Sequence, residues 1–329
     1  MASECEEYGE MESQALLCTF MLIGCFQPLL AAAGAKATTP QGWAYIREGP
    51  TDVRQGPAES RRAIAELGRG ALAAVYESVS KGAVAWNRLR TADMKTLSSK
   101  TGWVRSDQID VLPFEQFPSD ATLLKQLGGV YLEDYTASHT ELARFIVRRG
   151  VQEPALVCFL WTPVLPHARL QIFLSSHGQF SPGPFLEFPR SEMDAGITEL
   201  EVRDLLGNSN ESLVSREPFR LGPENRGLNL VIRRIEDSSL KILWKAPLEF
   251  RNLTAFAPSV QKLDPPIRNM GMPGTVTKAE IEFRLRGSVR EPVWKGTIEL
   301  HVFGREEPIE TLKIEKVCAW DGSRFMPLL

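Results

Sequence analysis

Two groups of residues carry side chains that could act in catalysis. Cys158 with His167 would supply a thiol nucleophile and its base, and SHTE at 138–141 places a base beside a hydroxyl and a carboxylate. Cys158 lies in the apolar run 155–161, where a buried and unreactive thiol is the expected state. Residues adjacent in sequence rarely converge in one site, so 138–141 is better explained as a solvated turn. Neither group by itself predicts a catalytic site.

Familiar catalytic and cofactor motifs are missing from the sequence. It contains no G-x-S-x-G, H-E-x-x-H, P-loop or G-x-G-x-x-G pattern. Its histidines and cysteines form no C-x-x-C pair and no cluster with the spacing of metal ligands. We therefore expect no cofactor and no metal, and we favour a protein that acts by binding over an enzyme.

One stretch has the outline of a calcium loop. ITELEVRDLLGNSNESLV at 197–214 resembles the D-x-D-G-D-G-x-x-E loop of FG-GAP/VCBS-like β repeats, in which carboxylates hold Ca²⁺. Asp204, Gly207 and Asn208 match that loop. The third-position carboxylate, the second glycine and the closing glutamate are replaced by Leu206, Ser209 and Ser212. Because two oxygen ligands are missing, we expect Asp204 and Asn208 to form the turn without the metal.

The C-terminal WDGSRF at 320–325 resembles a hairpin that such repeats use. Asp-Gly is a strong turn signal between two strands. No internal repeat of roughly 40–50 residues accompanies it, so the sequence predicts a hairpin and not a propeller.

Length and composition describe an ordinary soluble globular protein. The 329 residues are enough for two or three domains, and 43% are hydrophobic and 24% charged. The formal net charge is −3, and no clustered basic excess occurs. The composition therefore excludes a typical nucleic-acid binder.

Residues 1–38 are predicted to be an export segment. The apolar run 15–35 ends in Ala33-Gly34-Ala35, as a signal peptide and its cleavage site do, although the preceding residues are acidic. LIGC at 22–25 also resembles a lipobox, which would place a lipid on Cys25 and tether the chain. A single membrane-anchoring helix is a third reading. We favour cleavage and an extracytoplasmic location (periplasm, cell envelope or secreted), with membrane contact only through this segment.

Residues 39–112 alternate short apolar runs with turn signals. Strands are expected at 44–46, 71–75, 86–90 and 101–104, with turns at Gly-Pro pairs between the first two. Several short strands at this spacing indicate a small barrel.

Four ordered motifs carry a family resemblance in this region. VRQGP at 53–57, LGRG at 67–70, WNRLR at 86–90 and TGWV at 101–104 are similar to those of bacterial SH3-like (SH3b) domains. Gly56 and Gly70 would supply backbone angles that a side chain forbids.

The SH3b resemblance implies a binding module of the bacterial envelope, often directed at cell-wall peptides. Aromatic side chains in its loops would bind the ligand, and the candidates are Tyr45, Tyr76, Trp86 and Trp103. The tryptophans are equally well explained as core residues. Peptidoglycan or an envelope protein would be the partner.

A second domain is expected at 121–329, after a linker at 113–120. The pattern is β-like, with strands expected at 155–161, 170–174, 228–232, 240–244, 281–285 and 297–303, while 140–149 fits a helix or a strand. Cys158 and Cys318 could form one disulfide or be two buried thiols.

The sequence thus predicts a mainly β protein, with a small SH3-like barrel followed by a larger β-rich domain. The expected function is that of an exported bacterial envelope protein that binds a ligand through the SH3b-like module. The alternative is a cell-wall hydrolase whose catalytic domain carries no familiar motif.

Overall fold

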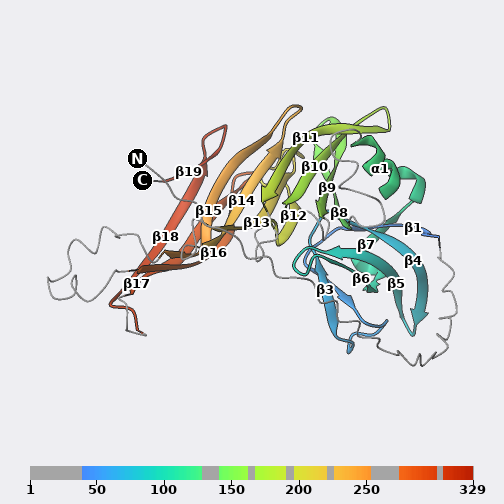
Figure 1. Cartoon of the computed structure of the whole chain (residues 1–329), viewed down its shortest axis with the longest axis horizontal. Helices are drawn as coiled ribbons and strands as arrows, with labels where there is room; N and C mark the ends of the chain where they lie inside the picture. The colour runs from blue at the N-terminus through green and yellow to red at the C-terminus, as the bar shows by residue number, and fades with distance from the viewer. Residues whose placement is uncertain are drawn as a thin grey trace, which may run out of the picture. The chain divides into compact units, whose positions relative to one another are not determined.

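Two antiparallel β-sheets make up most of the chain, which confirms the mainly β prediction (Figure 1). The computed structural model describes residues 39–127, 141–161, 167–189, 196–220, 226–252, 274–301 and 307–328. The export segment, Cys25 and residues 138–140 lie outside the described residues. Residues 39–329 form one compact unit.

The first sheet joins the N-terminal strands to four strands from later in the chain. Its order is β11-β10-β9-β8-β4-β5-β6-β2-β3, and β1 pairs with β4 and β7. The strands are β1 (Gly42–Ile46), β2 (Thr51–Arg54), β3 (Ala63–Leu67), β4 (Ala71–Lys81), β5 (Val84–Asp93), β6 (Ser98–Arg105), β7 (Ile109–Leu112), β8 (Glu141–Arg149), β9 (Gln152–Trp161), β10 (His167–Ser176) and β11 (Gln179–Pro189).

The second sheet is a meander in which every strand pairs with the next. Its order is β12 to β19, and Figure 1 shows the long strands β14–β18 running beside one another. The strands are β12 (Glu199–Arg203), β13 (Ser212–Arg220), β14 (Arg226–Ile235), β15 (Leu240–Asn252), β16 (Gly274–Arg286), β17 (Val289–His301), β18 (Glu310–Trp320) and β19 (Phe325–Pro327).

Backbone pairing continues between β4 and β8, on either side of the predicted linker. Ala71 lies opposite Phe145 and Leu72 opposite Arg144. In the N-terminal group the described pairings end at β3 and at β7, so they do not close a barrel. The SH3-like barrel therefore stays a prediction, while the predicted strands are confirmed and pair antiparallel.

The segment predicted as a linker packs against β1. It contains the short helix η2 (Phe114–Gln116) and leads into α1 (Asp120–Gln126). Trp43 stacks on Phe114 with ring centroids 5.2 Å apart, and its indole N–H donates to the Phe114 carbonyl over 3.0 Å. Phe117 is buried.

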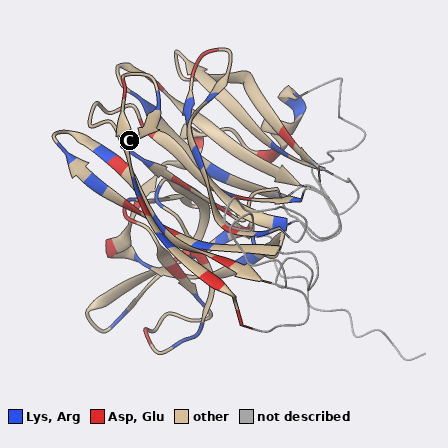
Figure 2. Cartoon of the chain, turned by 90° about the vertical axis from the view of Figure 1, so that its left-hand side faces the viewer, with Lys and Arg blue, Asp and Glu red and all other residues tan. Residues whose placement is uncertain are grey.

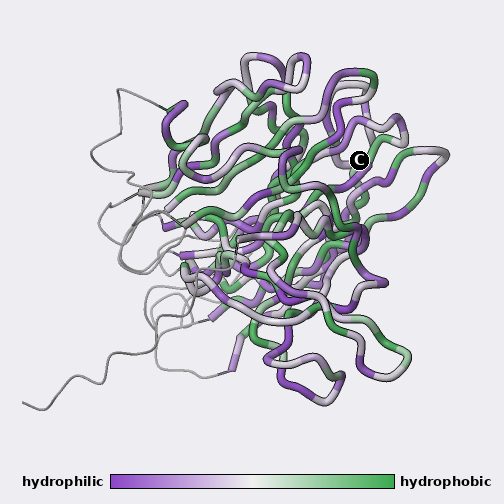
Figure 3. Tube along the Cα trace, turned by 90° about the vertical axis from the view of Figure 1, so that its right-hand side faces the viewer, coloured by the Kyte–Doolittle hydropathy of each residue, from purple (hydrophilic) through white to green (hydrophobic). Residues whose placement is uncertain are grey.

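Alternation along β8 and β9 divides the hydrophobic core into layers. One face of these strands joins Leu123 and Leu124 of α1 in a cluster that also contains Tyr45. The opposite face carries Phe145 and Phe159 and packs against residues of the second sheet, among them Leu200 and Val202. Figure 3 shows hydrophobic and hydrophilic stretches alternating along the strands, as a half-buried sheet requires. The part of the first sheet formed by β8 and β9 is therefore covered on one side by α1 and on the other by residues of the second sheet.

A third cluster lies within the second sheet. Trp244 of β15, Trp294 of β17 and Cys318 of β18 share it, and the Trp244 indole lies 3.3 Å from the Cys318 sulfur. Basic and acidic residues are interspersed on the exposed strands (Figure 2). Cross-strand pairs such as Lys295 with Glu282, at 2.6 Å, place opposite charges side by side.

The predicted strands and the predicted C-terminal hairpin are confirmed over the residues that the structure describes. Strands occur where they were expected, and 140–149 is resolved as strand β8 over its described residues. The C-terminal hairpin is confirmed, because Trp320 pairs with Phe325 and Asp321 accepts hydrogen bonds from the backbone N–H groups of Ser323 and Arg324. Within the described segments, no helix has the length and apolar character needed to cross a membrane.

Candidate functional site

A cleft of about 540 Å³ lies between the N-terminal strands and the second sheet. We call it the β3–β12 cleft. Its lining comes from separate stretches of the chain, at 50–96, 143–145 and 198–216, together with Leu230, Ile281 and Phe283. The volume falls within the range of roughly 300–1,000 Å³ that ligand pockets occupy.

The N-terminal wall of the cleft is held by strand pairing and by one tight turn. Glu66 is fixed on β3, opposite Asp52 of β2. Lys95 lies in the β5–β6 turn, where the Asp93 carboxylate accepts hydrogen bonds from the backbone N–H groups of Lys95 (3.0 Å) and Thr96 (3.4 Å). An aspartate that caps its own turn in this way fixes the direction of the residues that follow.

The opposite wall is formed by β12 and β13. Glu199 lies directly across from Arg216, and the backbone N–H of Thr198 donates to the Arg216 carbonyl over 2.9 Å. Glu201 and Arg203, two residues apart on β12, form an ion pair of 2.8 Å. The walls are therefore two antiparallel hairpins from distant parts of the chain.

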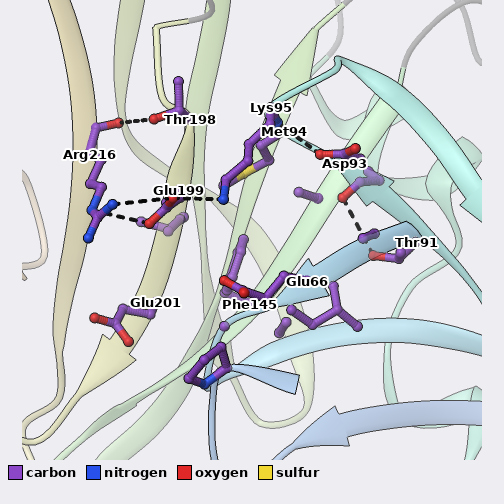
Figure 4. A pocket seen from close by; sticks show the side chains of 18 of the residues that line it. Glu66, Thr91, Asp93, Met94, Lys95, Phe145, Thr198, Glu199, Glu201 and Arg216 are labelled. Atoms are coloured by element: carbon purple, nitrogen blue, oxygen red, sulfur yellow. Dashed lines mark hydrogen bonds and ion pairs between the residues drawn. The ribbon is translucent and has the colours of Figure 1, made fainter. Parts of the chain in front are cut away.

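One carboxylate connects the two walls. Glu199 accepts from the Lys95 ammonium at 2.9 Å and lies 3.1 Å from the Arg216 guanidinium. Figure 4 shows the two cations approaching Glu199 from opposite sides. The hydrogen bond to Glu199 raises the pKa of Lys95, which keeps its side chain charged.

The floor of the cleft is apolar. Buried side chains of Met94, Phe145, Leu200 and Leu230 contribute to it, together with the partly exposed Phe283. The Arg203 guanidinium stacks over the Phe283 ring at 4.8 Å. Small-ligand sites are lined mainly by apolar side chains with a few polar groups, and this cleft combines apolar side chains with a larger number of charged ones.

The turn between β3 and β4 contacts β12 of the opposite wall. Gly70 has φ +85°, and a Cβ there would lie 2.5 Å from a methyl carbon of Val202 on β12. The Val202 backbone N–H donates to the Arg69 carbonyl over 2.9 Å, and that of Ile146 donates to the Gly70 carbonyl over 2.9 Å. The prediction that position 70 requires a glycine is confirmed. Its positive φ is one reason, and the close approach of Val202 in the second sheet is another.

Gly56 does not have the role predicted for it. Its φ is outside the left-handed region, so a positive φ is not the reason for a glycine at this position. Arg54 instead organises this turn, because its guanidinium donates to the carbonyls of Glu59 and Arg61, each over 2.9 Å.

The four predicted ligand-binding aromatics are only partly brought together. Trp86 and Trp103 are diagonal neighbours on one face of β5 and β6, since Trp86 pairs with Arg105 and Trp103 with Arg88. Trp86 is buried, whereas Trp103 is partly exposed.

The two tyrosines lie elsewhere. Tyr76, partly exposed, occupies the irregularity in β4 where the register shifts between Val75 and Glu77. Tyr45 is buried against the cluster that contains α1, and burial raises its pKa. None of the four lines the β3–β12 cleft.

The structure gives the candidate thiol nucleophile an inert setting. Cys158 is fully buried in the α1 cluster, and desolvation raises its pKa to about 12. A thiol in that setting stays protonated and is a poor nucleophile. The His167 side chain lies outside the described residues. Cys158 and Cys318 are both free and buried, in different clusters, so no disulfide joins them.

The degenerate calcium loop forms a turn closed by its own side chains. The two Asp204 oxygens accept from the backbone N–H groups of Gly207 (2.8 Å) and Ser209 (3.3 Å), and Asn208 accepts from Asn210 (3.1 Å). The Ser209 carbonyl accepts from the Gly150 N–H over 3.1 Å, which docks the loop on the β8–β9 turn. Among the described residues, no group of three or more His, Cys, Asp or Glu is placed to hold a metal.

No family model matches the chain, and neither the comparison with curated proteins nor that with solved structures finds a match.

Sequence reasoning did not single out the cleft residues Glu66, Lys95, Phe145 and Glu199. Lys95 lies between the strands predicted at 86–90 and 101–104, in a polar stretch without a motif. No spacing motif links these residues, because they are adjacent only after the first sheet and the second sheet have packed.

Proposed function

We propose that the protein is an exported binding protein of the bacterial envelope and that the β3–β12 cleft holds its ligand, a short cell-wall peptide. The observation that carries the proposal is the cleft itself, with its apolar floor and a rim of both charges. Peptide segments offer the same combination of apolar side chains and charged groups. The SH3b-like module would then bind at its β2–β3 side, together with the second sheet.

The order of strand pairing supports an SH3-like module. Strands β4, β5 and β6 form a meander, β1 pairs with β4 and β7, and the β2–β3 hairpin folds back on β6. Small β-barrels, including partly open ones, arise when a meander curls so that its flanking strands fold back on it. The partly exposed Tyr76 and Trp103 remain candidates for a second contact with the ligand.

A pull-down of the protein on purified peptidoglycan tests the proposal. We expect retention above that of a matched control protein and loss of retention in Thr198→Trp, because Thr198 lines the cleft and a large side chain there would fill it. Thr311→Trp on the exposed part of β18 is the control variant, since Thr311 lies outside the cleft. If Thr198→Trp and Thr311→Trp are retained equally on peptidoglycan, the ligand binds outside the β3–β12 cleft.

A zymogram on cell-wall substrate separates binding from hydrolysis. The proposal predicts no clearing zone. A clearing zone that is lost in Cys158→Ala or His167→Ala would contradict the proposal and favour the hydrolase.

The location outside the cytoplasm is proposed from the signal-like segment 15–35. N-terminal sequencing of protein from fractionated cells is the test, with a Cys25→Ser variant as control. We expect a mature chain that begins near Lys36. A chain that begins at a lipidated Cys25 would support the tether instead, and an intact chain in the cytoplasm would contradict export.

A further inference from the structure

We infer that the β3–β12 cleft recognises a zwitterionic ligand: Glu66 binds the ammonium group, Lys95 and Arg216 bind the carboxylate, and the apolar floor takes the aliphatic part between them. This inference rests on the proposed function and names the chemistry of the ligand. The charged side chains that line the cleft differ in whether they already have partners within the protein.

Most of the cationic side chains that line the cleft already interact with other groups of the protein. Arg203 pairs with Glu201 and stacks on Phe283. Arg144 lines the cleft but directs its guanidinium elsewhere, because that group lies 4.6 Å from the Trp43 ring centroid and donates to the Pro118 carbonyl over 2.8 Å. These two arginines are therefore occupied within the protein.

Most of the carboxylates are matched as well. Asp52 pairs with Arg54 at 2.8 Å, and Asp93 accepts from the backbone of its own turn. Glu66 is the exception. In the part of the chain that the structure describes, its carboxylate has no ion pair and no side-chain hydrogen bond, although it is exposed at the cleft. A carboxylate in this position can accept a charge-assisted hydrogen bond from a ligand ammonium.

Lys95, Glu199 and Arg216 form a group with the opposite preference. Two cations share one carboxylate, so the group carries a net charge of +1. The Lys95 and Arg216 side chains are 54% and 46% exposed, which leaves donors on both for a second anion. A ligand carboxylate would satisfy them at the same rim of the cleft.

The two charged positions lie within reach of one ligand. Glu66 acts electrostatically on Lys95, and both line the same cleft (Figure 4). Phe145 and Met94 provide apolar surface in that cleft. A short peptide with an aliphatic amine side chain and a free C-terminal carboxylate has this arrangement of groups.

Calorimetric titration with three synthetic peptides tests the inference. The first is Ala-Gln-Lys-Ala with a blocked N-terminus and a free C-terminus; the second carries an acetylated lysine; the third has an amidated C-terminus. We expect each modification to weaken binding by about tenfold or more, the size of one charge-assisted contact. Glu66→Gln should bind the first peptide about as weakly as the wild type binds the acetylated one.

The variants separate the two contacts. Glu66→Gln should no longer distinguish acetylated from free lysine, while it still prefers the free C-terminus. Lys95→Met should still distinguish acetylated from free lysine as the wild type does, while its preference for the free C-terminus, now with Arg216 as the only donor, should be smaller. Glu115→Gln, an exposed glutamate of η2 outside the cleft, is the control and should behave as the wild type.

Two results would overturn the inference and leave the proposed function standing. The first is retention on peptidoglycan with equal affinity for all three peptides, and the second is retention with no peptide binding at all. Absence of both peptide binding and peptidoglycan retention would contradict the inference and the proposed function together.

Discussion

Arg69 donates a hydrogen bond to Glu211 over 3.1 Å and thereby joins the β3–β4 turn to the loop that precedes β13. The Glu211 side chain is 2% exposed, and its second oxygen accepts from the Arg148 backbone N–H over 2.8 Å. One buried carboxylate therefore holds residues from the N-terminal strands, from β8 and from the second sheet. The β3–β4 turn follows β3 of one cleft wall, and Glu211 directly precedes β13 of the other wall.

Glu211→Ala should destabilise the protein by roughly 1–3 kcal/mol, since it leaves the Arg148 N–H and the Arg69 guanidinium without their acceptor. Urea unfolding followed by tryptophan fluorescence measures this. Glu77→Ala, which removes an ion pair whose side chains are both nearly half exposed, is the matched control and should cost less than about 1 kcal/mol. Equal losses for the two variants would mean that the junction is not a special contact.

Gly70→Ala should be much more harmful than Gly82→Ala. Both glycines have positive φ, at +85° and +63°, so both substitutions incur the left-handed cost of about 1–2 kcal/mol. A Cβ at Gly82 meets nothing within 4 Å, whereas one at Gly70 overlaps Val202. We expect an additional loss of about 1–3 kcal/mol for Gly70→Ala from this overlap. Thermal unfolding of the two variants provides the comparison, and similar midpoints would argue against the close approach.

Stability should fall as the pH rises above 9 because of Cys158. The pKa of a solvent-exposed cysteine thiol is 9.0, and burial raises that of Cys158 to about 12 in the folded chain. Below pH 9 the thiol is protonated in both the folded and the unfolded chain. Between pH 9 and 12 it stays protonated only in the folded chain. Ionisation of the thiol therefore stabilises the unfolded state in this pH range. Between pH 8 and pH 10 this thiol should lower the free energy of unfolding by about 1.4 kcal/mol.

Chemical unfolding of the wild type and of Cys158→Ala at pH 8 and pH 10 isolates this effect. Burial also raises the pKa values of Tyr45 and Cys318, but these groups are unchanged in the variant and cancel in the comparison. The variant should be less stable at pH 8 and should lose less stability on going to pH 10. A parallel loss in both proteins would show that Cys158 is not the source.

Asp204→Ala should lower the stability by about 1 kcal/mol, because the Gly207 and Ser209 N–H groups lose their acceptor. Millimolar calcium should leave the melting temperature of the wild type unchanged, since the carboxylate is already used within the turn. A calcium-dependent rise in melting temperature that disappears in Asp204→Ala would contradict this prediction and show that the loop binds the metal.

Much of the local structure could be predicted from the sequence. The continuous apolar run 155–161 and the period-2 pattern of 228–232 mark strands β9 and β14, and the glycines and aspartates at Gly70, Asp204 and Asp321 mark turns. These features depend on a few consecutive residues, whose side-chain volumes and backbone freedom act directly. The same local reasoning was wrong at Gly56, where the neighbouring Arg54 organises the turn through contacts that no motif describes.

The sequence by itself thus determined the mainly β character, the turns and the inert setting of Cys158. Only the tertiary structure decided that β8 continues the N-terminal sheet, that 113–120 packs on Trp43, and that Glu66, Lys95 and Glu199 line one cleft. The physical reason is the range of the interactions. Hydrophobic alternation shows that a strand has a buried face. Which segment packs against that face depends on interactions between parts of the chain that are distant in sequence. A cleft forms only where two such packed surfaces leave space between them.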